Sequence, residues 1–284
     1  MATIRRIVTA AHTTEGAGFP IRRPFPSAEL SMVDPFLMLD HIGPVNWAPG
    51  EALGAPDHPH RGFETISYVL AGHKVHRDSR GGHGVLGPGD VQWMTAGAGI
   101  VHSELPTPAF KASGGLSHGF QIWVNLPARE KMCTPHYQDL RAACIPQTCS
   151  TDGLATVKII AGESQGISAA IDTKTALTYL HITVRAGGAF EHAIAAGQNA
   201  MIYVFAGELW IGADNARVAE GQLVLLDDAC TVRLGTRSFA ECLLLCGEPL
   251  GEPVARMGPF VMNTRAEIEQ AMTDYHAGHM GVIQ

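Results

Sequence analysis

The chain has 284 residues, of which 46% are hydrophobic and 17% are charged, and its formal net charge is −7. This length exceeds the usual size of one domain and the composition suits a packed core, so we expect two folded domains and little disorder. An acidic chain without a clustered basic face is not suited to direct nucleic-acid binding.

The sequence contains no stretch that approaches the ~20 consecutive apolar residues needed to span a bilayer, and its first residues lack the apolar core of a secretory signal. We therefore predict a cytoplasmic protein that does not contact membranes. No pair of cysteines forms a C-x-x-C motif, so we expect buried thiols rather than disulfides or zinc ligands at Cys133, Cys144, Cys149, Cys230, Cys242 and Cys246.

Short apolar segments rich in branched and aromatic residues recur along the chain, and turn-forming residues separate them. Many short strands with frequent turns are typical of an all-β barrel or sandwich. In chain order, the predicted strands are residues 65–72, 90–97, 120–126, 156–162, 178–184, 200–207, 209–213, 223–229 and 242–247.

One helix is predicted near the end, in residues 263–278. Thr264 suits the N-cap, and Glu267 three residues later completes a capping-box pattern. Gly278 suits the C-terminal cap.

An internal repeat relates the two halves of the chain. The segment ISYVLAG at residues 66–72 recurs as MIYVFAG 135 residues later, and GPGDVQWM around Gly89 matches AEGQLVLL around Gly221, an offset of 132 residues. Such self-similarity indicates two copies of one β-domain with a boundary near residue 135. We therefore predict a metal-binding domain at 1–134 and a second domain, which ends in the helix, at 135–284.

The metal-binding prediction rests on two pairs of side chains in the first copy. On an extended strand His58 and His60 point to the same face, roughly 6 to 7 Å apart. Pro59 between them cannot donate a ladder hydrogen bond, which places the pair at a strand end or edge near the mouth of a barrel. His102 and Glu104 repeat the same spacing.

Three imidazoles and a carboxylate form a mixed nitrogen and oxygen set that suits iron, nickel, copper, manganese or zinc. A six-coordinate ion would keep two positions for water, substrate or dioxygen, as a catalytic site requires. Glu64 also shares strand parity with His60, so spacing alone does not decide between Glu64 and Glu104 as the acidic ligand. We interpret the other nearby histidines, His73, His76 and His83, as surface or rim residues of a solvated turn.

The repeat allows a comparison with the second copy. At the two offsets, the residues that correspond to His58, His60, Glu64, His102 and Glu104 are Ala193, Ala195, Asn199, Leu234 and Thr236. The second copy is therefore predicted to lack every candidate ligand.

These motifs resemble a known family. HPHRGFET with GPGD and the later histidine resembles the two cupin motifs, and residues 57–72, 89–104, 121–127 and 258–271 together resemble pirin and the bacterial pirin-like proteins over nearly the whole chain. The resemblance implies two tandem, jelly-roll-like cupin barrels, with a metal in the N-terminal barrel alone. It favours His58, His60, His102 and Glu104 as ligands. Glu64 is the generic cupin alternative, or otherwise a hydrogen-bond partner that orients an imidazole.

The resemblance also implies an activity. Several pirin-like proteins act as quercetin 2,3-dioxygenases (flavonol 2,4-dioxygenases), which open the flavonol heterocycle with O2 and release carbon monoxide. We therefore expect an Fe(II) enzyme acting on a small aromatic substrate and O2, with Zn, Mn, Ni, Cu or Co as alternative metals. The carboxylate of Glu104, or that of Glu64, would accept the proton of the substrate hydroxyl.

Two other functions are compatible with the same residues. A redox-sensing regulatory protein would act through protein partners, because oxidation of the metal changes the charge of the site. A zinc-dependent isomerase or hydrolase is a further alternative, because one fold serves many functions.

Overall fold

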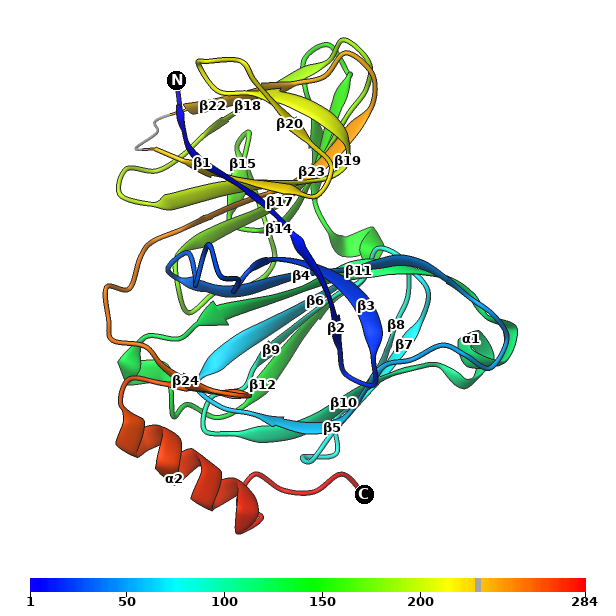
Figure 1. The fold of residues 1–284 in the computed structure, drawn as a ribbon, viewed down its shortest axis with the longest axis vertical. Helices are drawn as coiled ribbons and strands as arrows, with labels where there is room; N and C mark the ends of the chain where they lie inside the picture. Colours follow the sequence, from blue (N-terminus) through cyan, green and yellow to red (C-terminus); the bar gives the residue numbers. More distant parts are fainter. Residues whose placement is uncertain (228–230) are drawn as a thin grey trace. The chain divides into compact units, whose positions relative to one another are not determined.

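The computed structural model describes residues 1–227 and 231–284, in which strands predominate (Figure 1). The chain forms two compact units. The first, called the histidine unit here, consists of residues 12–23, 36–142 and 250–284, and the second unit consists of residues 1–11, 24–35 and 143–249. The predicted all-β class is confirmed.

The two units differ from the continuous segments 1–134 and 135–284 that the repeat predicts. The main division of the chain falls between residues 142 and 143, but each unit also receives a terminal segment from the other half. Strand β1 (Ile4–Thr9) pairs antiparallel with β21 (Gln222–Leu226), so its backbone hydrogen bonds belong to the second unit. Residues 250–284 belong to the histidine unit because they form backbone hydrogen bonds with it, between Arg61 and Pro259 and between Val261 and Arg61.

The histidine unit contains a seven-stranded and a four-stranded sheet. The larger sheet has the order β12-β9-β6-β11-β4-β3-β2 and the smaller the order β5-β10-β7-β8. The strands are β2 (Ala11–Glu15), β3 (Phe19–Phe25), β4 (Phe36–Trp47), β5 (Ala55–His60), β6 (Phe63–Ala71), β7 (Lys74–Asp78), β8 (His83–Leu86), β9 (Val91–Thr95), β10 (Ile100–Pro106), β11 (Gly115–Asn125) and β12 (His136–Leu140). The short helix α1 (Pro108–Ser113) joins β10 to β11.

The second unit is built around a ten-stranded sheet. Its main path is β1-β21-β19-β23-β17-β14-β13, and β18, β20 and β22 lie off this path. The strands not yet described are β13 (Gln147–Cys149), β14 (Ala155–Ala161), β17 (Leu177–Val184), β18 (Ala189–Ala193), β19 (Asn199–Ile211), β20 (Ala216–Ala219), β22 (Thr231–Gly235) and β23 (Ala240–Gly247). A small β15 (Glu163–Ser164) and β16 (Ile167–Ser168) pair separately.

The predicted strands are found in the structure with small changes at their ends. Segments 200–207 and 209–213 form one continuous strand, β19. The strand predicted at 223–229 ends at Leu226 as β21, and residues 228 and 229 lie outside the described residues. Strands β18, β19 and β22 contribute apolar side chains to the core, since Phe190, Leu209, Val232 and Leu234 belong to one buried apolar cluster.

The predicted C-terminal helix is α2 (Arg265–His276), and its capping box is present. The Thr264 hydroxyl accepts a hydrogen bond from the Glu267 amide, while the Glu267 carboxylate accepts one from the Thr264 amide at 2.8 Å. Gly278 has φ of 78°, which only glycine adopts without strain. Neither α-helix in the described part of the chain has the length and apolar character needed to cross a membrane.

The C-terminal segment packs on the histidine unit beside β10. Strands β24 (Ala255–Met257) and β25 (Phe260–Met262) form a hairpin, and α2 packs on it with Ile268 and Ala271. These residues share a buried apolar cluster with Val101 of β10. The Arg61 guanidinium donates a hydrogen bond to the Asp274 carboxylate at 2.7 Å, which fixes the helix to the loop after β5.

The cysteine prediction holds only in part. Cys242 and Cys246 are buried, but Cys133 is half-buried and Cys144 and Cys149 are exposed. The described cysteines form no disulfide, and Cys230 lies outside the described residues.

Candidate metal centre

Three histidines from two neighbouring strands converge in the histidine unit. His58 and His60 lie on β5, and His102 lies on β10, where it is the cross-strand partner of His58. One ring nitrogen from each residue lies within 4.8 Å of those of the other two. The predicted position of His58 and His60 at a strand end or edge agrees with the structure, because β5 is the first strand of its sheet and ends at His60.

The ring nitrogens of these histidines are arranged as metal ligands need to be. His58 Nδ1 lies 2.7 Å from the Pro56 carbonyl, which can only accept, so Nδ1 donates and Nε2 keeps its lone pair. His60 Nδ1 and both ring nitrogens of His102 are buried and have no hydrogen-bond partner among the described residues. Buried polar atoms normally have a partner, so a divalent ion fits this donor set.

Burial also keeps two of the imidazoles in the form that binds metals. His60 and His102 are 3% and 1% exposed. Burial, followed by the charges of neighbouring histidines, lowers the pKa of both residues well below the usual value for histidine. They are therefore neutral at physiological pH, with a lone pair available.

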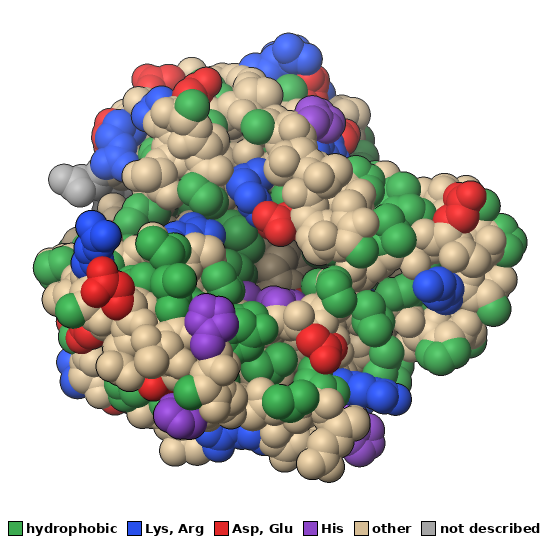
Figure 2. Space-filling view, turned by 60° about the horizontal axis from the view of Figure 1, so that its bottom comes forward, with side chains coloured by type: hydrophobic (Ala, Val, Ile, Leu, Met, Phe, Trp, Pro, Cys, Tyr) green, Lys and Arg blue, Asp and Glu red, His purple; other side chains and the backbone are tan. Residues whose placement is uncertain are grey.

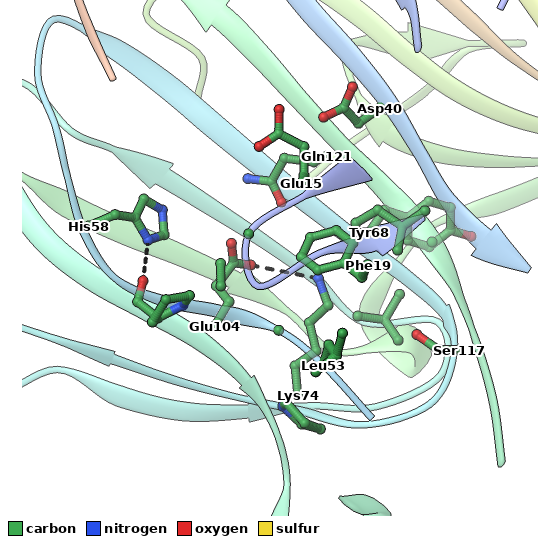
Figure 3. Close-up of a pocket in the computed structure, with 18 of the residues that line it drawn as sticks. Glu15, Phe19, Asp40, Leu53, His58, Tyr68, Lys74, Glu104, Ser117 and Gln121 are labelled. Carbon is green, nitrogen blue, oxygen red and sulfur yellow. Dashed lines mark hydrogen bonds and ion pairs between the residues drawn. The ribbon is translucent and has the colours of Figure 1, made fainter. Parts of the chain in front are cut away.

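Glu104 lies close to this cluster but is engaged elsewhere. Its Oε1 accepts a hydrogen bond of 2.6 Å from the Ser67 hydroxyl and lies 3.8 Å from Lys74 Nζ (Figure 3). Burial by itself raises the pKa of Glu104, but Lys74 and Ser67 outweigh it and hold this pKa below the usual value. The carboxylate is therefore ionised, although it is not part of the group of three histidines.

Glu64 faces a different side of its strand. Ser67 reaches Glu104 from one face of β6, and because side chains alternate along a strand, Glu64 points to the opposite face. Its Oε1 accepts a hydrogen bond of 2.6 Å from the Thr95 hydroxyl on β9. The structure does not bring Glu64 into the group of three histidines.

The interpretation of three further histidines as rim residues is right for two of them. His73 and His83 are exposed, but His76 is 2% exposed and its ring lies 5.4 Å from that of His102. The polar composition of the segment suggested a solvated turn, yet β7 begins within it at Lys74. Strand alternation then directs Lys74, His76 and Asp78 to the same inner face.

The three-histidine cluster adjoins a cavity of about 570 Å³ that is lined by the histidine unit. Figure 2 shows a hollow in the surface with histidine atoms visible inside it. Its lining combines apolar and aromatic side chains, including Phe19, Trp47 and Trp123, with His58, His60 and Glu104. Such a cavity accommodates a small molecule with flat rings next to the histidines.

Comparison with known proteins identifies the family. The Pirin family model matches residues 18–124, and the model of the Pirin C-terminal cupin domain matches residues 179–281. The chain belongs to the pirin family. A pirin-like protein of Caulobacter vibrioides is 42% identical, over 97% of this chain and 98% of that protein. Pirin of Homo sapiens is 40% identical, over 96% of this chain and 92% of that protein.

The solved structures agree with the expected pair of cupin barrels. A crystal structure of quercetin 2,3-dioxygenase from Acinetobacter baumannii has a TM-score of 0.94 and 34% identity, and each chain covers 100% of the other. The predicted fold is therefore confirmed for this member of the pirin family.

The strand register of the second unit differs from the correspondence that the repeat predicts. In the first copy His58 pairs with His102 and Ile100 with His60, and in the second Phe190 pairs with Leu234 and Val232 with His192. The counterparts of His58 and His60 are therefore Phe190 and His192, not Ala193 and Ala195. The prediction that every candidate ligand is replaced is wrong at this one position.

The reason is a difference in loop length. Two residues join β5 to β6, whereas five join β18 to β19, so the offset changes from 132 to 135 between these strands. His192 is buried, and its Nδ1 lies 3.3 Å from the Ser164 hydroxyl. Its neighbours Phe190 and Leu234 lie in the apolar core, where they cannot coordinate a metal.

Several residues that line the cavity are not indicated by any sequence motif. Arg256, Gly258 and Pro259 line the cavity although they lie 154 to 201 residues after the three histidines in the sequence. The Arg256 guanidinium lies 4.7 Å from the centre of the Trp123 ring, a cation–π contact. No local sequence pattern around these residues predicts that they reach the site. The same is true of Lys74 and Ser67.

Proposed function

We propose that this pirin-family protein is a metal-dependent dioxygenase that opens flavonols such as quercetin with O2. The observation that carries the proposal is the convergence of three imidazoles, with unpartnered buried nitrogens, beside an aromatic-lined cavity. The similarity to the quercetin 2,3-dioxygenase of Acinetobacter baumannii supports it.

His58 through Nε2, His60 and His102 would hold the ion, and Glu104 would complete the ligand set. Fe(II) is the metal we propose, with Zn, Mn, Ni, Cu and Co as the alternatives that metal analysis distinguishes. The ion would supply Lewis acidity and, for a redox-active metal, electron transfer to O2. Glu64, on the opposite face of β6, is proposed to stabilise the barrel through Thr95 rather than to bind the metal.

The protein groups around the cluster would bind and orient the substrate. Phe19, Trp47 and Trp123 line the cavity and would give a flat ring system aromatic surface to pack against. The Glu104 carboxylate is ionised and would accept the proton of a substrate hydroxyl, while Ser67 donates a hydrogen bond to one of its oxygens. The apolar part of the wall limits the water that competes for these groups.

The test measures oxygen and quercetin consumption by the protein loaded anaerobically with Fe(II). We expect loss of quercetin to begin when O2 is admitted, with one O2 consumed per flavonol. Quercetin loss without O2, or no turnover with any of the six metals, would contradict the proposal. The exposed-site variant His83→Ala serves as a control that should behave like the wild type, because His83 lies outside the cavity.

The same preparation tests the two alternatives. Full zinc occupancy after purification without added metal, together with no flavonol turnover, would favour a zinc-dependent isomerase or hydrolase. A redox-sensing regulator would bind a protein partner only in one oxidation state of the metal. The volume and aromatic lining of the cavity favour a small-molecule substrate over a partner protein at this site.

A further inference from the structure

The inner face of β7 places one lysine at the side of the cavity. Lys74, His76 and Asp78 alternate along this strand, and the first of them lines the cavity. The Lys74 side chain is 24% exposed, whereas those of His76 and Asp78 are almost fully buried. Lys74 is thus the residue of this face that a molecule in the cavity can reach, as Figure 3 shows for its approach to Glu104.

Lys74 differs from the other cationic groups near the cavity in what its charge contacts. Arg23 is fully engaged, because it donates two hydrogen bonds of 2.6 Å to Asp40 and another to Glu15. Arg256 lies over the Trp123 ring and donates to the Leu37 carbonyl. The ammonium of Lys74 instead forms a loose ion pair of 3.8 Å with Glu104.

The charge of Lys74 lies beside the proposed ligand set. Strand β7 pairs with β10, which carries His102 and Glu104, and the Lys74 ammonium lies 3.8 Å from Glu104 Oε1. A divalent ion held by these residues would experience the same positive charge as a repulsion. If Glu104 bound such an ion, the Lys74 ammonium would lose its carboxylate partner, and an anionic group of a bound molecule could replace that partner.

We propose that Lys74 determines substrate specificity by binding an anionic oxygen of an aromatic substrate, at the cost of weaker metal binding by the three histidines. This inference rests on the proposed function, because it takes His58, His60 and His102 as metal ligands. The substrate class is an aromatic molecule that carries an ionised hydroxyl or a carboxylate. Removal of the charge should weaken binding of the anionic substrate and strengthen binding of the metal. A purely structural role of Lys74 would not produce changes of opposite sign.

The experiment compares Lys74→Met, which removes the charge and keeps the length, with Lys74→Arg, which keeps the charge. Nickel(II) affinity is measured by competition with a chelator, and we expect Lys74→Met to bind nickel about tenfold more tightly than the wild type. Lys74→Arg should stay within about threefold of the wild type. Circular dichroism and thermal unfolding verify that each variant is folded, and Lys74→Gln is a second uncharged variant.

The second measurement is calorimetric binding of 2-naphthoate and of its uncharged analogue 2-naphthamide to the nickel-loaded protein. We expect Lys74→Met to bind naphthoate about tenfold more weakly and to bind naphthamide as the wild type does. Lys74→Arg should retain the preference for the carboxylate. Neither measurement requires turnover. Absence of quercetin turnover with iron would therefore contradict the dioxygenase proposal without affecting the result for Lys74.

Three kinds of result would contradict the proposed role of the Lys74 charge. An equal loss of naphthoate and naphthamide affinity in Lys74→Met would indicate a packing role. Unchanged naphthoate affinity, or nickel affinity that falls or does not change, would show that the charge does not act as proposed. Failure of the wild type to bind nickel, or to bind naphthoate, would overturn it as well.

Discussion

His58 and His102 face each other across β5 and β10, with their ring centroids 4.3 Å apart. Because both strands belong to one sheet, their backbone hydrogen bonds hold the Cα atoms of the two residues opposite each other without help from a ligand. Folding therefore brings the two histidines together, and the free energy of metal binding is not reduced by the conformational entropy of bringing these two residues together.

Removal of His102 should abolish metal binding. We expect His102→Ala to retain less than one tenth of the metal content of the wild type, because two imidazoles from one strand remain. The measurement is metal analysis after loading and desalting, with His83→Ala as the matched control from an exposed position. Full metal content in His102→Ala would show that the cluster is not the metal site.

The two glutamates should respond differently to the same substitution. Glu104→Gln should lower metal affinity by about ten- to a hundredfold, because it removes a negative charge next to the histidines. Glu64→Gln should keep the metal and alter the free energy of unfolding by about 1 kcal/mol, since Thr95 keeps a neutral acceptor. The opposite pattern in a chelator competition would identify Glu64 as the ligand.

The ion pair between Arg61 and Asp274 should stabilise the attachment of α2. The Arg61 side chain is 5% exposed, so Asp274→Asn leaves a buried guanidinium without its charged partner. We expect a loss of about 2 kcal/mol in the free energy of unfolding. The control is Glu269→Gln, which breaks the exposed pair with Arg265 and should cost below about 0.5 kcal/mol in the same urea titration. Equal effects of the two substitutions would contradict the assigned role.

Lys131 should make stability depend on pH in the alkaline range. Burial lowers the pKa of this amine to about 8, whereas in the unfolded chain it stays near its usual value of 10.5. Between these values the unfolded state binds more protons, so stability should rise with pH by roughly 1 kcal/mol per pH unit relative to a variant without the amine. Denaturant titrations at pH 8, 9 and 10 of the wild type and Lys131→Met test this.

The variant is expected to be less stable at every pH, because the amine donates hydrogen bonds to the Gly62 and Val261 carbonyls and to the Asn125 side chain. The informative quantity is the difference in slope. Identical slopes for the two proteins would show that the folded-state pKa of Lys131 is not lowered.

Strand periodicity is sufficient to predict that two of the three clustered histidines share one face. His58 and His60 share a face because strand side chains alternate, and the cross-strand register then brings His102 beside them. The same reasoning could not separate Glu64 from Glu104, because both residues are buried and parity does not say which face of β6 meets β10.

Other parts of the site depend on contacts that local sequence does not encode. The composition around His76 predicts an exposed turn, whereas the pairing of β7 with β10 buries this residue. Arg256 and Pro259 reach the cavity through the hairpin of β24 and β25 and the packing of α2, which the sequence pattern does not relate to the histidines. The counterpart of His60 was misplaced because a loop of different length separates the two repeat motifs.

The division of the chain into two interrupted units has a consequence for the order of synthesis. The ribosome produces residues 143–249, which belong to the second unit, before residues 250–284, which complete the wall around the histidines. A nascent chain that stops short of residue 250 already carries His58, His60 and His102 but lacks Arg256 and Pro259. The finished cavity, and with it any selection among substrates, therefore comes into existence only after the second unit has been translated.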